Sequence, residues 1–170
     1  MAELQRTPER FSTGEYLRRL RQTRAEMEAR GLDVLIMSDP SNMAWLAGYG
    51  GWSFYVHQCV IVGPQGDPVW FGRGQDRAGA QRTCWLPDTS LIGYPDHYVQ
   101  STERHPMDYL VARLTDLGWH RGTIGVEMDN YWFTAAAYRA LSPLPATLID
   151  ATALVNWQRL VKSPAELDSM

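Results

Sequence analysis

The chain has 170 residues, of which 45% are hydrophobic and 21% are charged. This balance predicts one globular domain with one core, and it excludes a disordered segment, a coiled coil and a collagen-like chain. The formal net charge of -3 lacks the broad positive field that attracts phosphate backbones, so we expect no nucleic-acid partner.

Cysteine usage and hydropathy indicate the compartment. Cys59 and Cys84 are the two cysteines, which is too few for a disulfide framework, and this favours a reducing compartment. The first thirty residues carry charges where a signal peptide needs an apolar stretch, and no run of eighteen apolar residues follows. We therefore expect a cytoplasmic protein without a membrane partner.

The N-terminal part predicts a helix followed by a strand. Ser12 and Glu15 have the spacing of a capping box, and apolar residues then recur at helical intervals until Gly31 ends the pattern. The apolar run over residues 33–37 predicts a strand that is buried on both faces.

Helices and strands continue to alternate along the rest of the chain. Asp39-Pro40 predicts the start of a short helix over residues 41–47, which Gly48 ends. The alternation predicts an α/β fold, a three-layer α/β/α sandwich with a mixed β-sheet in which an early hairpin contributes an antiparallel pair. The remaining predicted strands are 57–62, 68–71, 90–93, 123–127 and 147–149, and the remaining predicted helices are 75–84, 106–117 and 131–141.

A further helix is predicted at the C-terminal end. Ser163-Pro-Ala-Glu166 combines an N-cap serine, a proline at the first helical position and a glutamate at the third. A helix that stops four residues later is not stable alone, because the cost of nucleation is recovered only over several turns. We therefore expect residues 1–161 to form one domain and residues 162–170 to begin a linker helix that leads to a further domain.

Common catalytic motifs are not found. The stretch Gly72-Arg-Gly-Gln-Asp-Arg-Ala-Gly79 follows a predicted strand, but its third glycine comes too late for a dinucleotide-binding loop. The four histidines are scattered without the spacing of metal ligands, and Cys84 has no basic neighbour that would activate it. We predict no catalytic residue, no metal site and no cofactor in this domain, whereas Arg73 and Asp76 are candidates for an ion pair within the chain or between subunits.

One loop concentrates aromatic side chains. Gly48-Tyr-Gly-Gly-Trp-Ser-Phe-Tyr-Val-His57 places four aromatic rings around a flexible glycine pair. Strand alternation cannot bury every ring on one face, so some rings are expected to face solvent or a partner. Exposed aromatic faces can hold a small cation, and each well-placed contact contributes about 0.5 to 2 kcal/mol. The alternative is that these rings pack beneath the loop as part of the core.

Three further stretches are characteristic: Gly31-Leu-Asp-Val-Leu-Ile-Met-Ser-Asp-Pro-Ser-Asn-Met-Ala-Trp-Leu-Ala-Gly48, Trp70-Phe-Gly-Arg-Gly-Gln-Asp-Arg-Ala-Gly79 and Arg159-Leu-Val-Lys-Ser-Pro-Ala-Glu166. With the aromatic loop, they resemble the N-terminal domain of the creatinase/prolidase family over nearly the whole chain from Tyr16 onward. Within that family, Gly51-Trp-Ser-Phe-Tyr-Val-His-Gln58 is most similar to the ectoine hydrolases.

The resemblance implies a cytoplasmic two-domain enzyme whose larger C-terminal domain has the pita-bread fold and carries the catalytic residues. It implies a homodimer in which the N-terminal domain reaches toward the active site of the partner subunit and shares its small-molecule substrate. In peptidase members the C-terminal domain binds two metal ions, whereas creatinase and ectoine hydrolase work without that centre. Carried over by position, the substrate-binding residues are Trp52, Phe54, Tyr55 and His57.

The resulting expectation is a dimerisation domain that completes the substrate site of a hydrolase, with ectoine hydrolase, which opens a cyclic amidine at a C–N bond, as the favoured activity. One alternative is the N-terminal domain of an Xaa-Pro aminopeptidase, a prolidase or a creatinase. The other is a stand-alone interaction domain without catalysis.

Overall fold

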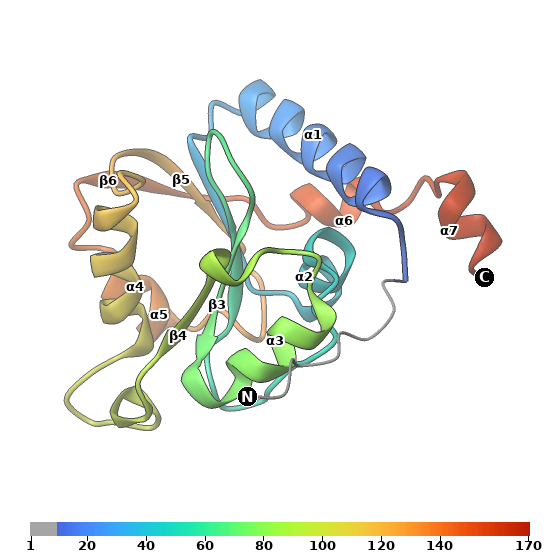
Figure 1. Ribbon diagram of the computed structural model, residues 1–170. Coiled ribbons are helices and arrows are strands. Elements are labelled where there is room, and N and C mark those ends of the chain that lie inside the picture. The colour runs from blue at the N-terminus through green and yellow to red at the C-terminus, as the bar shows by residue number, and fades with distance from the viewer. Residues whose placement is uncertain (1–9) are drawn as a thin grey trace.

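A six-stranded sheet lies between two layers of helices in the computed structural model, which describes residues 10–170 (Figure 1). This arrangement confirms the predicted three-layer α/β/α sandwich. The strands are β1 (Val34–Met37), β2 (Cys59–Val62), β3 (Val69–Arg73), β4 (Leu91–Tyr94), β5 (Gly122–Val126) and β6 (Ala146–Asp150).

The sheet is mixed, as the sequence predicts. Its strand order is β4-β3-β2-β1-β5-β6. β2 pairs antiparallel with both β1 and β3, so the hairpin supplies the antiparallel part, while the pairs β1–β5, β5–β6 and β3–β4 are parallel. Because β1 and β5 are parallel neighbours, their carboxyl ends meet at one edge of the sheet.

Two groups of helices cover the two faces of the sheet, and Figure 1 shows them on opposite sides. One face packs against α1 (Thr13–Ala29), α2 (Pro40–Ala47), α3 (Arg77–Thr83) and α6 (Leu154–Gln158), and the other against α4 (Pro106–Asp116) and α5 (Ala135–Leu141). The short helix α7 (Pro164–Asp168) projects from the first group beyond α6 (Figure 1). Three 3-10 turns are η1 (Gly74–Asp76), η2 (Asp88–Ser90) and η3 (Asp96–Tyr98).

The side chains of β1 pack into the hydrophobic cores on both faces of the sheet. Leu35 and Met37 pack with α1 and α2, whereas Val34 and Ile36 pack with α4 and α5. All four side chains are at most 1% exposed, so the apolar run is buried on both faces as predicted.

Three predicted boundaries are wrong. The strand predicted from residue 57 begins at Cys59, which pairs with Phe71. The carbonyl oxygen of His57 does not take part in the sheet, because it accepts a hydrogen bond from the Tyr94 hydroxyl (3.0 Å). The helix predicted from residue 131 begins after Thr134, whose hydroxyl accepts the main-chain N–H of residue 137 (3.1 Å). The helix predicted from residue 75 starts instead with the 3-10 turn η1, and α6 was not predicted.

A buried carboxylate joins the carboxyl ends of β1 and β5. Glu127 directly follows β5 and is 2% exposed. One of its oxygens accepts the main-chain N–H groups of Ser38 (2.6 Å) and Asp39 (2.7 Å), and the other accepts the side-chain amide of Asn42 (2.6 Å). Burial raises the pKa of Glu127, although these hydrogen bonds oppose the shift. The carboxylate therefore fixes where α2 begins.

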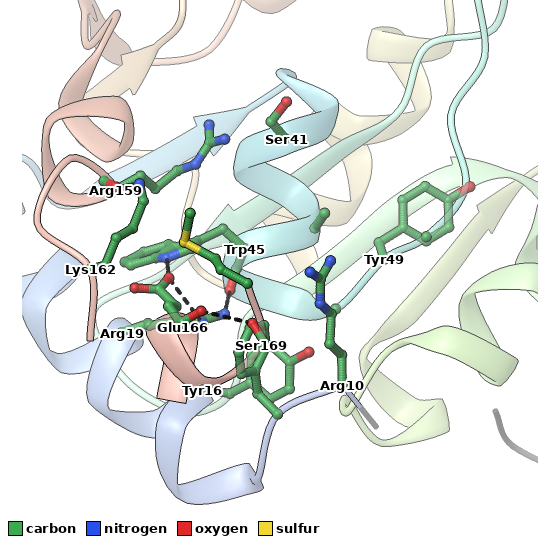
Figure 2. A pocket seen from close by; sticks show the side chains of 15 residues that line it. Arg10, Tyr16, Arg19, Ser41, Trp45, Tyr49, Arg159, Lys162, Glu166 and Ser169 are labelled. Carbon is green, nitrogen blue, oxygen red and sulfur yellow. Dashed lines mark hydrogen bonds and ion pairs between the residues drawn. The ribbon is translucent and has the colours of Figure 1, made fainter. Parts of the chain in front are cut away.

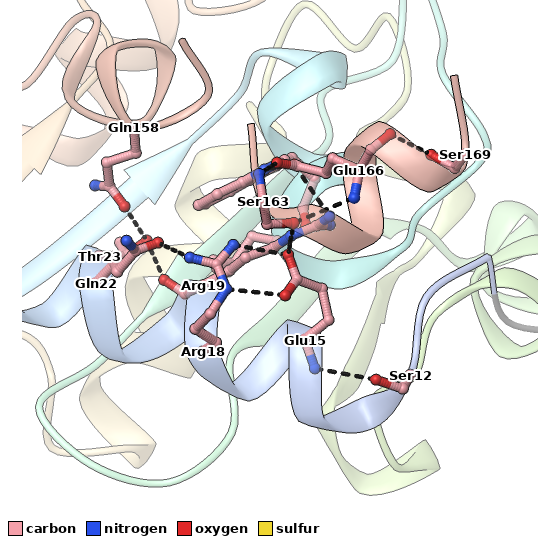
Figure 3. A network of polar contacts seen from close by, with 12 residues as sticks. Ser12, Glu15, Arg18, Arg19, Gln22, Thr23, Gln158, Ser163, Glu166 and Ser169 are labelled. Carbon is pink, nitrogen blue, oxygen red and sulfur yellow. Dashed lines mark hydrogen bonds and ion pairs between the residues drawn. The ribbon is translucent and has the colours of Figure 1, made fainter. Parts of the chain in front are cut away.

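A second polar network attaches α7 to α1, as Figure 3 shows. The Arg19 guanidinium is fully buried, and it contacts Glu15 (3.0 Å), Glu166 (3.1 Å) and the carbonyl oxygen of Trp45 (2.7 Å). The Ser163 hydroxyl donates to Glu15 (2.9 Å), and Ser163 and Glu166 form the predicted capping box. Helix α7 is thus stabilised by tertiary contacts, which explains how so short a helix forms.

Replacing Glu127 with glutamine is expected to lower the free energy of unfolding by about 2 kcal/mol. Glutamine keeps the shape but places an amide donor where the carboxylate accepts, so at least one buried N–H loses its acceptor. Urea unfolding followed by tryptophan fluorescence measures the loss. Glu28→Gln, on the exposed face of α1, is the matched control and is expected to stay within about 0.5 kcal/mol of the parent. Equal stability of the two variants would contradict the role of Glu127.

Replacing Arg19 with methionine is expected to cost about 3 to 5 kcal/mol, because Glu15 and Glu166 then lose their buried cation. The same unfolding experiment measures this loss, with the exposed Arg21→Met on the same helix as control. Adding Glu166→Gln to the Arg19 variant is expected to recover part of the loss. No recovery would mean that the stabilisation does not come from the ion pair.

Candidate substrate-binding site

The aromatic loop connects α2 to β2, and a glycine sets its direction. Gly48 ends α2 in the left-handed conformation, with a φ angle of 75°. A Cβ atom at this position would lie 2.9 Å from the Tyr16 hydroxyl and 3.0 Å from the carbonyl oxygen of Thr83. Glycine is therefore required both by the backbone conformation and by the close packing.

Tyr49 belongs to the core rather than to the exposed rings. Its side chain is 3% exposed, and its ring lies 5.3 Å from that of Trp70. The hydroxyl accepts the Gln58 amide (3.0 Å), and burial raises the pKa of this phenol. A Cβ atom on Gly51 would lie 2.6 Å from the same hydroxyl, so the loop backbone passes directly over Tyr49.

The other three rings of the loop face outward. The exposed fractions are 53% for Trp52, 84% for Phe54 and 60% for Tyr55. Trp52 and Phe54 meet edge to face with their centroids 4.3 Å apart. Ser53 accepts the main-chain N–H groups of Tyr55 (3.4 Å) and Val56 (3.3 Å), and Val56 is buried, so the loop is anchored beneath its exposed rings. The expectation that some rings face solvent is confirmed.

Two of these rings border a cavity of about 310 Å³. Trp52 and Tyr55 form part of its wall, whereas Phe54 contacts Trp52 and is not among the lining residues. The cavity also exposes one guanidinium, from Arg73, and one carboxylate, from Asp76. The lining residues are Tyr49, Gly51, Trp52, Ser53, Tyr55, Val56, Gln58, Arg73, Gln75, Asp76 and Gly79.

The two charged groups of this cavity form no direct ion pair with each other, although the charge of Asp76 contributes to the raised pKa of Arg73. Arg73 pairs with Asp96 through two hydrogen bonds (2.8 and 3.1 Å), and this contact raises the pKa of Arg73 and lowers that of Asp96. Asp76 accepts the buried Gln58 amide (3.3 Å). The anticipated ion pair of Arg73 with Asp76 is thus not formed among the described residues, because Arg73 pairs with Asp96 instead.

His57 points to a different place from the aromatic rings. It lines a smaller cavity of about 110 Å³ on the α4 side, where its ring centroid lies 4.5 Å from that of His105. His105 caps α4, since its Nδ1 atom accepts the main-chain N–H of Met107 (3.1 Å). Burial, aided by the neighbouring His105, lowers the pKa of His57 to about 4. Tyr55 and Val56 border both cavities, but His57 lines only the smaller one and Trp52 only the larger one, so the structure separates these two side chains.

A larger cavity, of about 480 Å³, lies between α1, α2 and α7 (Figure 2). Four of its charged groups make polar contacts within the chain, the first two being Glu166 and Arg19: Glu166 accepts from Arg19 and from the Trp45 indole (2.6 Å). Arg159 donates to the Asn42 side chain (2.8 Å), and Lys162 donates to the carbonyl oxygen of Arg159. These pairings favour a structural role in holding α7.

Sequence reasoning did not find all the polar residues of the aromatic cavity. Gln58 and Asp76 were not assigned to it, because Gln58 directly precedes a predicted apolar strand and Asp76 is separated from Trp52 by the β2–β3 hairpin. The signal that was present is the stretch from Gly72 to Gly79, which begins in the last two residues of β3 and continues through η1 into α3. Among the described residues, no three His, Cys, Asp or Glu side chains are placed to hold a metal ion, and no helix is long and apolar enough to cross a membrane. Cys59 and Cys84 are both buried, and neither forms a disulfide bond.

Comparison with known proteins defines the family. Residues 19–161 match the creatinase/prolidase N-terminal domain, and the chain belongs to this family. The ectoine hydrolase of Halomonas elongata is 57% identical over 163 residues, which cover 94% of this chain and 41% of that protein. An uncharacterized hydrolase/peptidase of Sinorhizobium fredii is 40% identical over 94% of this chain and 42% of its own length. The chain therefore spans about two fifths of the length of each of these relatives.

Solved structures show the same fold. An Xaa-Pro dipeptidase from Bacillus anthracis superposes with a TM-score of 0.71 at 16% identity, over 90% of this chain and 38% of that chain. A proline dipeptidase from Streptococcus pneumoniae superposes with a TM-score of 0.67 at 23% identity, over 84% of this chain and 98% of that chain. At these identities the likeness shows the architecture and not the substrate.

The His57 imidazole is expected to titrate near pH 4 in an NMR titration of the ring resonances. Because its folded pKa lies below the ordinary value of about 6.5, the associated stability is present above pH 6.5 and is lost as the pH falls toward 4. His105→Asn keeps a capping side chain on α4 and removes the neighbouring charge, so it is expected to raise the His57 midpoint. Burial remains in that variant, so the midpoint stays below 6.5. A parent midpoint of 6.5 would contradict the burial of this ring.

Proposed function

We propose that this chain is the N-terminal domain of a cytoplasmic, homodimeric hydrolase and that its aromatic loop completes the substrate site of the partner subunit. The proposed substrate is a small cyclic amidine, with ectoine favoured. The observation that carries the proposal is a set of solvent-exposed rings beside a charged cavity, in a chain that is 57% identical to an ectoine hydrolase.

The chemistry of the loop suits such a substrate. Ectoine is a small ring with a delocalised amidinium cation and a carboxylate. The faces of Trp52 and Tyr55 can attract the cation, and the Arg73 guanidinium can attract the acid. Recognition of this kind uses binding groups only.

The hydrolytic step requires more than this domain provides. Addition of water at the amidine carbon needs a general base to activate the water and an acid to protonate the leaving nitrogen. We assign these groups to the C-terminal domain of the parent enzyme. For an ectoine hydrolase we expect activity to persist after treatment with a chelator, whereas the alternative, an Xaa-Pro peptidase, is expected to lose activity because its metal ions are removed. A full-length protein without hydrolytic activity on either class of substrate would favour the third possibility, a non-catalytic interaction domain.

In the hydrolase that contains this domain, Trp52→Ala is expected to raise the Michaelis constant for ectoine about fivefold or more, because a cation–aromatic contact worth about 1 to 2 kcal/mol is lost. Tyr138→Ala removes a ring that is 39% exposed on α5, across the sheet from the loop, and serves as control with an expected unchanged Michaelis constant. Steady-state kinetics on ectoine measures both variants. Unchanged kinetics of the Trp52 variant would remove the loop from the substrate site.

A further inference from the structure

Asp76 places a carboxylate without a counterion in the wall of the aromatic cavity. No arginine, lysine or histidine of the described chain lies within ion-pair distance of it. The nearby Arg73 is occupied by Asp96 through its Nε and Nη2 atoms. Asp76 therefore has no direct ion-pair partner among the described residues, and Arg73 acts on it only through space.

The local structure turns Asp76 toward the cavity. It occupies the N-cap position of α3, where an aspartate side chain commonly accepts main-chain N–H groups, yet it makes no capping hydrogen bond. Its Oδ2 atom instead accepts the amide of Gln58, and the same amide donates to the Tyr49 hydroxyl. Gln58 is 5% exposed and Tyr49 is 3% exposed, so the carboxylate is held from the core side.

Aromatic faces and a carboxylate on one cavity wall form a recognition site for a flat organic cation. Trp52 and Tyr55 supply ring faces, which favour a delocalised cation, and Asp76 supplies a hydrogen-bond acceptor for its N–H groups. A cavity of about 310 Å³ lies at the small end of ligand sites, which suits a compact ring or a single amidinium group.

We propose that Asp76 is a specificity-determining residue that binds the amidinium group of the substrate and selects it against neutral amides. This inference rests on the proposed function, because it assigns the cationic end of that substrate to a position in the same site. Arg73 lies on the same wall and faces the acidic end of a zwitterionic ligand.

The test uses acetamidinium chloride as the probe and acetamide as its neutral counterpart of equal shape. Both are titrated into the 170-residue chain, and binding is followed by NMR through the Trp52 indole N–H signal, assigned by comparison with Trp52→Phe. Acetamidinium is expected to shift this signal in a saturable way and acetamide is not. Asp76→Asn is expected to weaken acetamidinium binding about tenfold or more.

A second variant tests the charge without removing Asp76. Gly79 lines the same cavity, and a Cβ atom there meets no other atom within 4 Å. Gly79→Lys places an ammonium group within one helical turn of Asp76 and is expected to compete with acetamidinium, while lysine favours the helix more than glycine does. Gly79→Gln has a similar length without the charge, so the difference between these two variants isolates electrostatics from crowding. Asp67→Asn, in the turn at the opposite end of the β2–β3 hairpin, is the remote control with an expected unchanged affinity.

The outcomes separate this inference from the proposed function. Equal binding of acetamidinium by the parent and Asp76→Asn, or equal binding of acetamidinium and acetamide by the parent, would overturn the role of Asp76. Ectoine is titrated in parallel into the hydrolase that contains this domain, because the proposed substrate site is completed by the partner subunit. If ectoine binds the parent and Asp76→Asn equally, the proposed substrate survives and the role of Asp76 fails. If acetamidinium binds through Asp76 but ectoine does not bind, the amidinium site stands and ectoine is the wrong substrate.

Discussion

The buried Glu127 carboxylate is the contact from which the geometry of this domain follows. It lies where the parallel strands β1 and β5 end together, and it accepts two main-chain N–H groups from the start of α2 and one side-chain amide from Asn42. A buried charge is tolerated only when its hydrogen-bonding capacity is filled, so sheet and helix hold each other in one arrangement. Asn42 also binds Asn156 and Arg159, which extends the same network to α6.

The position of the aromatic loop depends on that arrangement. Helix α2 ends at Gly48, and the close approach of Gly48 to Tyr16 sends Tyr49 into the core. Tyr49 then holds Gln58, and Gln58 holds Asp76. The rigid part of the site is thus built from buried residues, while the rings that meet solvent are carried on a loop above it. This division suits a domain that presents binding groups to a reaction carried out elsewhere.

Fold and function are supported by different observations. Superposition on peptidases at 16% and 23% identity establishes the architecture, and one fold can serve several substrates. The substrate proposal comes instead from the aromatic loop and the charged cavity, together with the similarity to the ectoine hydrolase of Halomonas elongata. A peptide ending in proline has no delocalised cation at its scissile bond, so the proposal of a cyclic amidine rests on the Asp76 carboxylate beside the exposed rings.

The sequence by itself determined the layered fold and the location of the aromatic loop. Apolar periodicity, the caps at Asp39 and Ser163 and the glycine stop at Gly48 act over a few residues, so their effects can be predicted from spacing alone. Only the tertiary structure decided which polar groups accompany the rings. In the folded chain, Asp76 contacts the loop through Gln58, and His57 lies in a separate cavity beside His105. These positions depend on hydrogen bonds between distant segments and on the pairing of β3 with β4, which local spacing does not reveal.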